Sequence, residues 1–233
     1  MNNNVVLAIA VWFQRLGITT MRFNFSGSQI GRGDYQVDNV REAANFLLTG
    51  QHLNATTGSS VTKSKQSDES EEKKPPRFIL LVGYSYGSII CGSASSKIPQ
   101  CVATIMISPP LAVRHWLYMF NGNFHLDAAR LRRLPLLMMI GSKDNFTSED
   151  AFMDVVHTMP QNTTTGAILK EADHFFRGRE KDLMDIIGKS SKKLSMKNDR
   201  KRSSRKDSYH SHGTNSLCGA IALYFFNITF LKT

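Results

Sequence analysis

Apolar and polar positions along the chain repeat with two different periods, and these periods alternate from one segment to the next. One alternating segment and four short apolar runs are typical of strands: 18–25, 78–82, 102–107, 136–140 and 167–170. Apolar residues at helical spacing predict helices at 5–16, at 36–48, from Ser85 to about Lys97, at 149–159 and at 181–187. Strands that alternate with helices predict an α/β fold, with a mostly parallel sheet that carries helices on both faces.

The segment from Gly83 to Gly87 has the sequence Gly-Tyr-Ser-Tyr-Gly and joins the predicted strand at 78–82 to a helix. This is the sequence form of a nucleophile elbow, a sharp strand-to-helix turn that lifts a serine hydroxyl, here that of Ser85, above the sheet. The turn crowds the positions two residues before and after the serine, and glycine fits there because it has no Cβ. A simple Gly-Ser loop has the same pattern, so the interpretation depends on an acid and a histidine farther along the chain.

Both residues are present in the expected order. Asp144 comes just after the apolar run at 136–140, and His174 comes after the next predicted strand. Side chains that follow the carboxyl ends of parallel strands lie at the edge where open α/β sheets bind ligands. The order Ser85, Asp144, His174 is the nucleophile–acid–base order of α/β-hydrolases. Asp173 is the alternative acid because it adjoins His174, but adjacent side chains on a loop seldom face each other, so Asp144 is preferred.

The chain resembles the small α/β-hydrolases near the dienelactone hydrolase and prolyl oligopeptidase branch. The resemblance covers roughly residues 4–187, apart from an insertion near 51–76, and its matching stretches are 16–27, 83–87, 107–110, 141–144 and 172–176. It implies an α/β-hydrolase three-layer sandwich and cleavage of a small ester or related acyl substrate, with no cofactor and no metal. The stretches are specific for the family and not for a substrate.

The expected chemistry assigns a role to each candidate residue. Ser85 Oγ attacks an acyl carbonyl, His174 takes its proton, and Asp144 orients the imidazole. The backbone N–H of Tyr86 is expected to be one oxyanion-hole donor, because the residue after the nucleophile supplies it. Asn24 either lines the pocket or satisfies backbone groups. Three other histidines lack a matching context and are interpreted as surface or helix residues: His115, His125 and His157.

The chain departs from its relatives at one point. They carry an additional strand before the helix at 5–16, and that strand lies between those matching 18–25 and 78–82. The loop after it supplies the second oxyanion donor. The sequence therefore predicts an N-terminally truncated hydrolase body, and two functional classes stay open. One is an active serine hydrolase, and the other is a non-catalytic hydrolase-like protein that binds a ligand or partner.

Composition predicts one domain at 1–187, with a flexible insertion at 51–76 and a tail at 188–233 outside the domain. Residues 189–207 carry +7 of the formal net charge of +10, so the basic character belongs to the tail and the core is not expected to bind nucleic acid. About 15 apolar residues at 217–231 are too few to span a bilayer. A functionless tail, a membrane contact and a nuclear signal remain alternatives.

The three cysteines, Cys91, Cys101 and Cys218, show neither a disulfide framework nor metal-ligand spacing. Buried or tail thiols in a reducing compartment are the expected state, and a cytoplasmic location is predicted. No basic residue precedes the apolar stretch at 5–13, so it does not match a secretion signal.

Overall fold

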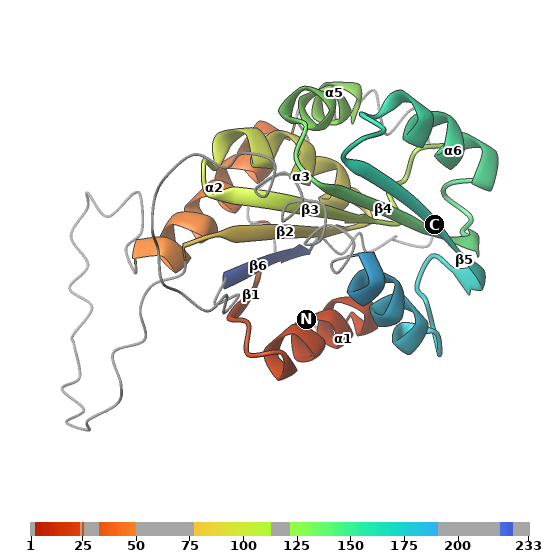
Figure 1. Cartoon of the computed structure of the whole chain (residues 1–233), viewed down its shortest axis with the longest axis horizontal. Coiled ribbons are helices and arrows are strands. Elements are labelled where there is room, and N and C mark those ends of the chain that lie inside the picture. Colours follow the sequence, from red (N-terminus) through yellow and green to blue (C-terminus); the bar gives the residue numbers. More distant parts are fainter. Residues whose placement is uncertain are drawn as a thin grey trace, which may run out of the picture.

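The computed structural model describes residues 3–23, 25, 33–49, 77–112 and 122–190, together with the backbone of 220–225. Within these residues one six-stranded sheet has the order β1-β6-β2-β3-β4-β5, and every neighbouring pair is parallel (Figure 1). Its strands are β1 (Thr20–Phe23), β2 (Ile79–Tyr84), β3 (Cys101–Ile107), β4 (Leu136–Lys143), β5 (Thr164–Asp173) and β6 (Ala220–Phe225).

Helices cover both faces of this sheet, which confirms the predicted three-layer α/β fold. One face carries α1 (Asn4–Arg15) and a helix over 180–190, and the other carries α2 (Asp34–Thr49), α3 (Tyr86–Lys97), α5 (Gly122–Arg132) and α6 (Glu149–Thr158) (Figure 1). Side chains of one strand alternate between the two layers, as Val82 packs with the α1 layer and Leu81 packs with α2 and α3. The central strands are therefore apolar along most of their length.

Local sequence sets the helix boundaries. Asn3 caps α1, because its side chain accepts a hydrogen bond from the backbone N–H of Val6 at 3.2 Å. Ser148 caps α6 in the same way, through the N–H of Ala151 at 3.2 Å. Both caps agree with the predicted starts of these helices.

Helix α5 is not predicted from the sequence, because its apolar side chains do not form one stripe. Leu126 is buried, but Phe124 is 52% exposed and Leu131 is 82% exposed. A helix whose apolar residues are spread around its axis shows no helical period. The predicted helix at 181–187 is part of a last helix that extends over residues 180–190.

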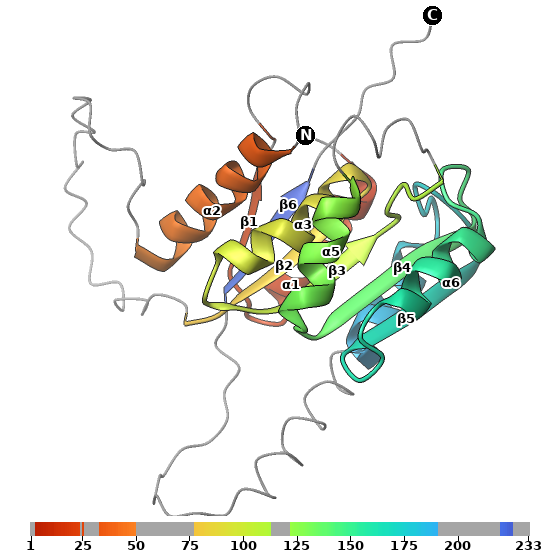
Figure 2. The ribbon, with the colours of Figure 1, turned by 90° about the horizontal axis from the view of Figure 1, so that it is seen from above.

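The larger difference concerns the end of the chain. Composition predicts that 188–233 lie outside the domain, whereas residues 220–225 form strand β6 between β1 and β2 (Figure 2). The strand pairs with β2 along its whole length and with β1 over residues 221–224, so that Ala222 lies opposite Leu81 on one side and Met21 on the other. It lies where relatives were expected to place their additional strand. The predicted insertion at 51–76 and the rest of the tail lie outside the described residues.

Two of the three cysteines lie in the described part of the chain. Cys91 and Cys101 are buried free thiols, and burial raises the pKa of Cys101 to about 11. Across the same residues, no group of three or more metal-ligating side chains gathers. Nor is any described helix both long enough and apolar enough to cross a membrane.

Candidate active site

Ser85 occupies a strained turn between β2 and α3. Its backbone has φ 53° and ψ −129°, in a region that residues with a Cβ rarely adopt. Three hydrogen bonds hold the turn. The Ser85 N–H donates to Ile107 O at 2.8 Å, and Ser85 O accepts from the Ser88 hydroxyl at 2.6 Å and from the Ser88 N–H at 3.0 Å. The first bond continues the pairing of β2 with β3 past the end of β2. The turn therefore projects Ser85 from the carboxyl edge of the sheet.

Gly83 allows α3 to pass close to β2. A Cβ at this position would lie 2.5 Å from the Cα of Ser88 and would also meet the carbonyl oxygen of Gly87. Both neighbours are backbone atoms that cannot rotate away. The close approach is the crowding that the sequence pattern predicted on the strand side of the turn.

We expect Gly83→Ala to destabilise the fold by about 1–3 kcal/mol, because backbone atoms must shift to admit the methyl group. Gly188→Ala is the matched control. It lies in the helix over 180–190, and its Cβ would only meet Trp12 at an ordinary 3.4 Å. Alanine there is expected to leave stability unchanged or raise it by up to about 1 kcal/mol. Urea unfolding of the two variants measures the difference, and equal stabilities would contradict the backbone clash.

A chain of two hydrogen bonds connects Ser85 to Asp144 through His174. The distance from Ser85 Oγ to His174 Nε2 is 3.1 Å, and the distance from His174 Nδ1 to Asp144 Oδ2 is 2.9 Å. A carboxylate only accepts hydrogen bonds, so Nδ1 carries the proton and Nε2 is the acceptor for the Ser85 hydroxyl. The side chains of His174 and Asp144 are 5% and 0% exposed, so water competes little with their bond.

A bulge between β4 and β5 sets the relative positions of the acid and the histidine. The pairing passes from Gly141 opposite Leu169 to Lys143 opposite Asp173, so β5 gains two extra residues there. Glu171, in the bulge, has φ 61°, and its N–H donates to Ser142 Oγ at 2.8 Å. The bulge bends β5 at the edge that carries both side chains, since His174 directly follows β5.

Two side chains from other elements hold the His174 loop. The Tyr84 hydroxyl donates to His174 O at 3.1 Å, and Asn4 of α1 donates from Nδ2 to Phe175 O at 2.9 Å. Asn4 also donates to Glu180 Oε1 at 2.7 Å. Burial raises the pKa of Tyr84 above its ordinary value, so its hydroxyl stays protonated and remains a donor. Sequence reasoning missed both residues, because neither carries a recognisable motif for this contact.

Tyr86 is the first residue of α3 and directly follows Ser85. Its backbone N–H therefore lies at the positive end of a 12-residue helix, where anions are stabilised. The aromatic ring packs against Phe25, with centroids 6.4 Å apart. The position agrees with the role expected for this N–H, and the assignment of that role stays a prediction.

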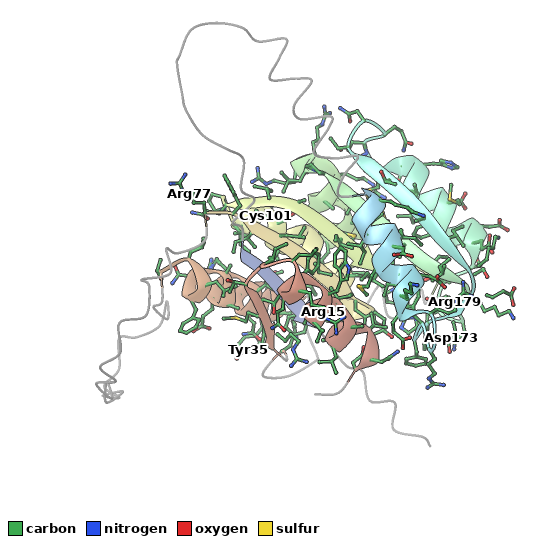
Figure 3. All side chains as sticks on the ribbon, turned by 60° about the horizontal axis from the view of Figure 1, so that its bottom comes forward. Arg15, Tyr35, Arg77, Cys101, Asp173 and Arg179 are labelled. Atoms are coloured by element: carbon green, nitrogen blue, oxygen red, sulfur yellow. The ribbon has the colours of Figure 1, made fainter. Side chains whose placement is uncertain are left out.

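The other candidate residues that the structure describes do not join the Ser85–His174–Asp144 chain. Asp173 lies at the end of β5, at the edge of the sheet opposite to the one where Arg77 and Cys101 lie (Figure 3). Its Oδ1 accepts the N–H of Phe175 at 3.0 Å. The Asp173 carboxylate thus stabilises a turn within its own loop, while Asp144 forms the hydrogen bond to His174. His157 lies exposed on α6, as expected, and Asn24 and His115 lie outside the described residues.

His125 is in a helix as expected, but it is completely buried rather than on the surface. Its Nδ1 lies 2.6 Å from the hydroxyl of Ser93 on α3. A Cβ on Gly33 would also meet its ring. The imidazole therefore connects α5 to α3 in the interior.

Comparison with solved structures shows the same fold in serine hydrolases. A serine hydrolase homologue from Coxiella burnetii is 19% identical, with 80% of this chain and 75% of that chain covered at a TM-score of 0.57. A serine hydrolase without lid from Xanthomonas campestris is 20% identical, with 83% and 75% covered at a TM-score of 0.59. The esterase domain of a Rhodothermus marinus protein is 19% identical, with 75% and 72% covered at a TM-score of 0.51.

These likenesses establish that the chain has the α/β-hydrolase fold. No protein-family model and no curated protein matches the sequence. The fold alone does not identify an activity, which belongs to the site.

Proposed function

We propose that this chain is a serine hydrolase that cleaves a small ester or related acyl substrate. The observation that carries the proposal is the continuous hydrogen-bonded chain from Ser85 through His174 to Asp144, mounted on a strained strand-to-helix turn. Nucleophilic catalysis needs a nucleophile within hydrogen-bond reach of a base, and a third group that orients the base. Ser85, His174 and Asp144 have this arrangement. Neighbours described as serine hydrolases and as an esterase support the same reaction class.

In this mechanism Ser85 Oγ attacks the substrate carbonyl carbon while His174 Nε2 takes the hydroxyl proton. The tetrahedral intermediate carries its negative charge on the former carbonyl oxygen, and the N–H of Tyr86 donates to it. His174 then protonates the leaving alcohol, and the acyl group stays on Ser85. Water attacks this acyl-enzyme with His174 as base, which releases the acid and restores the serine.

Asp144 stabilises the imidazolium that forms in each step. Its Oδ2 accepts from Nδ1, and its Oδ1 accepts the N–H of Phe146 at 2.9 Å, so both oxygens of the carboxylate are oriented. The ring of Phe146 lies edge-on to His174, with centroids 4.5 Å apart. A small-molecule acyl substrate and a cytoplasmic location accompany this proposal.

Labelling of the full chain with a fluorophosphonate tests the proposal. We expect one covalent adduct per folded chain, located by mass spectrometry on Ser85 within the tryptic peptide over 78–97. Ser85→Ala is expected to lose the adduct, while Ser96→Ala, on the helix that follows Ser85, keeps it. Heat-unfolded protein controls for non-specific reaction. A folded chain that forms no adduct would make the alternative correct, a hydrolase-like protein that binds without catalysis.

A further inference from the structure

Thr147 lies three residues after Asp144 and connects two loops at the carboxyl edge of the sheet. The residue is 2% exposed. Its hydroxyl donates to Pro109 O at 2.5 Å and accepts the N–H of Leu111 at 2.8 Å. A third bond runs parallel, from the N–H of Ala112 to Phe146 O at 3.2 Å. The loop that follows β3 is thus tied to the loop that carries Asp144.

The loop after β3 provides a firm attachment. It turns at Ser108, whose φ is 46°, and the Ser108 N–H donates to Met139 O at 2.8 Å. Ile107, one residue earlier, accepts the N–H of Ser85. The loop is therefore anchored on β4 and adjoins the turn that carries the nucleophile.

The contacts of Phe146 connect Thr147 to the reacting side chains. The Phe146 N–H donates to Asp144 Oδ1 at 2.9 Å, and its ring packs against His174. A shift of the backbone at 146–147 would move the hydrogen bond that orients Asp144 and the ring that supports the imidazole. Phe146 thus lies between Thr147 and the His174–Asp144 pair.

We propose that Thr147 is a positioning residue that holds Asp144 in place. The catalytic consequence of this role rests on the proposed function. Its hydroxyl fixes the distance between the Asp144 loop and the Ser85 turn, and so keeps Asp144 in line with His174 Nδ1. The hydroxyl acts through Phe146 and touches no reacting atom.

Thr147→Val tests this assignment, because valine keeps the shape and removes both hydroxyl hydrogen bonds. We expect the second-order rate constant for fluorophosphonate labelling to fall about 10–100-fold, since small displacements of catalytic groups cost this much. Thr147→Ser keeps the hydroxyl and is expected to restore the rate. The control is Ile98→Val or Ile98→Ala, whichever matches the Tm loss of Thr147→Val. Ile98 directly follows α3 and is buried in the core cluster beneath α2 and α3, which does not include Thr147 or its partners.

A spectroscopic measurement separates positioning from general destabilisation. The proton on His174 Nδ1 that bonds Asp144 is expected to give a downfield proton resonance in histidine labelled with ¹⁵N. We expect Thr147→Val to shift or broaden this resonance, while Thr147→Ser and the Ile98 variant keep it. An unchanged resonance in folded Thr147→Val would overturn the proposal, as would an equal loss of rate in the Ile98 variant.

Failure of the proposed function is a distinct result. A wild-type chain that keeps the resonance but does not label would refute hydrolysis, and the resonance would still decide whether Thr147 holds Asp144. If Thr147→Val does not fold, hydrogen exchange of the wild-type chain still tests the proposal. The Leu111 amide is expected to exchange slowly with solvent, and rapid exchange would overturn the proposed role of Thr147.

Discussion

Asp144→Asn is expected to lower the rate of fluorophosphonate labelling by about 10³–10⁴-fold while the fold is kept. The substitution preserves size, but a carboxamide can donate a hydrogen bond to His174 Nδ1 and so favour the tautomer that carries its proton on Nε2. That nitrogen then cannot accept the Ser85 proton, and loss of the correct tautomer costs about 10⁴ in known serine hydrolases. The labelling rate constant measures the loss, with circular dichroism as the check on folding.

Asp173→Asn is the matched comparison, because it makes the same chemical change one residue before His174. Its carboxylate bonds the N–H of Phe175 at 3.0 Å and belongs to the loop turn. Asparagine can accept the same bond through its carbonyl oxygen, so the labelling rate is expected to change by no more than a few-fold. If Asp173→Asn lowers the labelling rate as much as Asp144→Asn does, the assignment of Asp144 as the acid is wrong.

The fold class and the placement of the candidate side chains could be predicted because each depends on local sequence. The apolar runs at 78–82 and 136–140 contribute to the mostly buried strands β2 and β4, and in a parallel sheet the residues that follow such strands share one edge. Ser85, Asp144 and His174 each follow a strand or its bulge directly. Their approach to one another therefore follows from topology, without knowledge of any side-chain contact.

The residues that hold these side chains could not be predicted in the same way. Asn4 reaches the His174 loop across 171 positions of sequence, and Thr147 reaches Pro109 across 38. Their partners are backbone carbonyl groups, which every residue carries, so no motif marks the contact. The bulge at Glu171 likewise depends on how two strands pair and not on a period within either strand.

Strand β6 is the largest feature that sequence reasoning missed, because apolar composition shows neither where a segment docks nor which neighbours it pairs with. It is a central strand that separates β1 from β2, and within the described residues β1 pairs with no other strand. Strand β2 carries Ser85 at its end, so the β2 ladder to β6 lies next to the proposed nucleophile. The integrity of the site is therefore expected to depend on residues 220–225.

We expect Ala222→Pro to destabilise the protein strongly and to lower labelling at Ser85. Proline has no N–H to donate, and in a central strand the lost ladder bond leaves a buried carbonyl without its partner. Such a loss costs about 1–3 kcal/mol before any backbone clash, out of a typical total of about 5–15 kcal/mol. Urea unfolding measures the stability, and hydrogen exchange is expected to rise at 20–23 and 79–84, the two strands that β6 pairs with.

Glu149→Pro is the control for proline itself, because residue 149 is the first position of α6 and Ser148 before it is already extended, with ψ 158°. Proline is favoured at the first position of a helix and requires an extended residue before it, as Ser148 is, so little change in stability is expected. In the wild type, the amides at 220–225 should exchange as slowly as those of β2. Rapid exchange there, together with unchanged unfolding of Ala222→Pro, would show that β6 does not complete the sheet and that β1 and β2 are held together by other contacts.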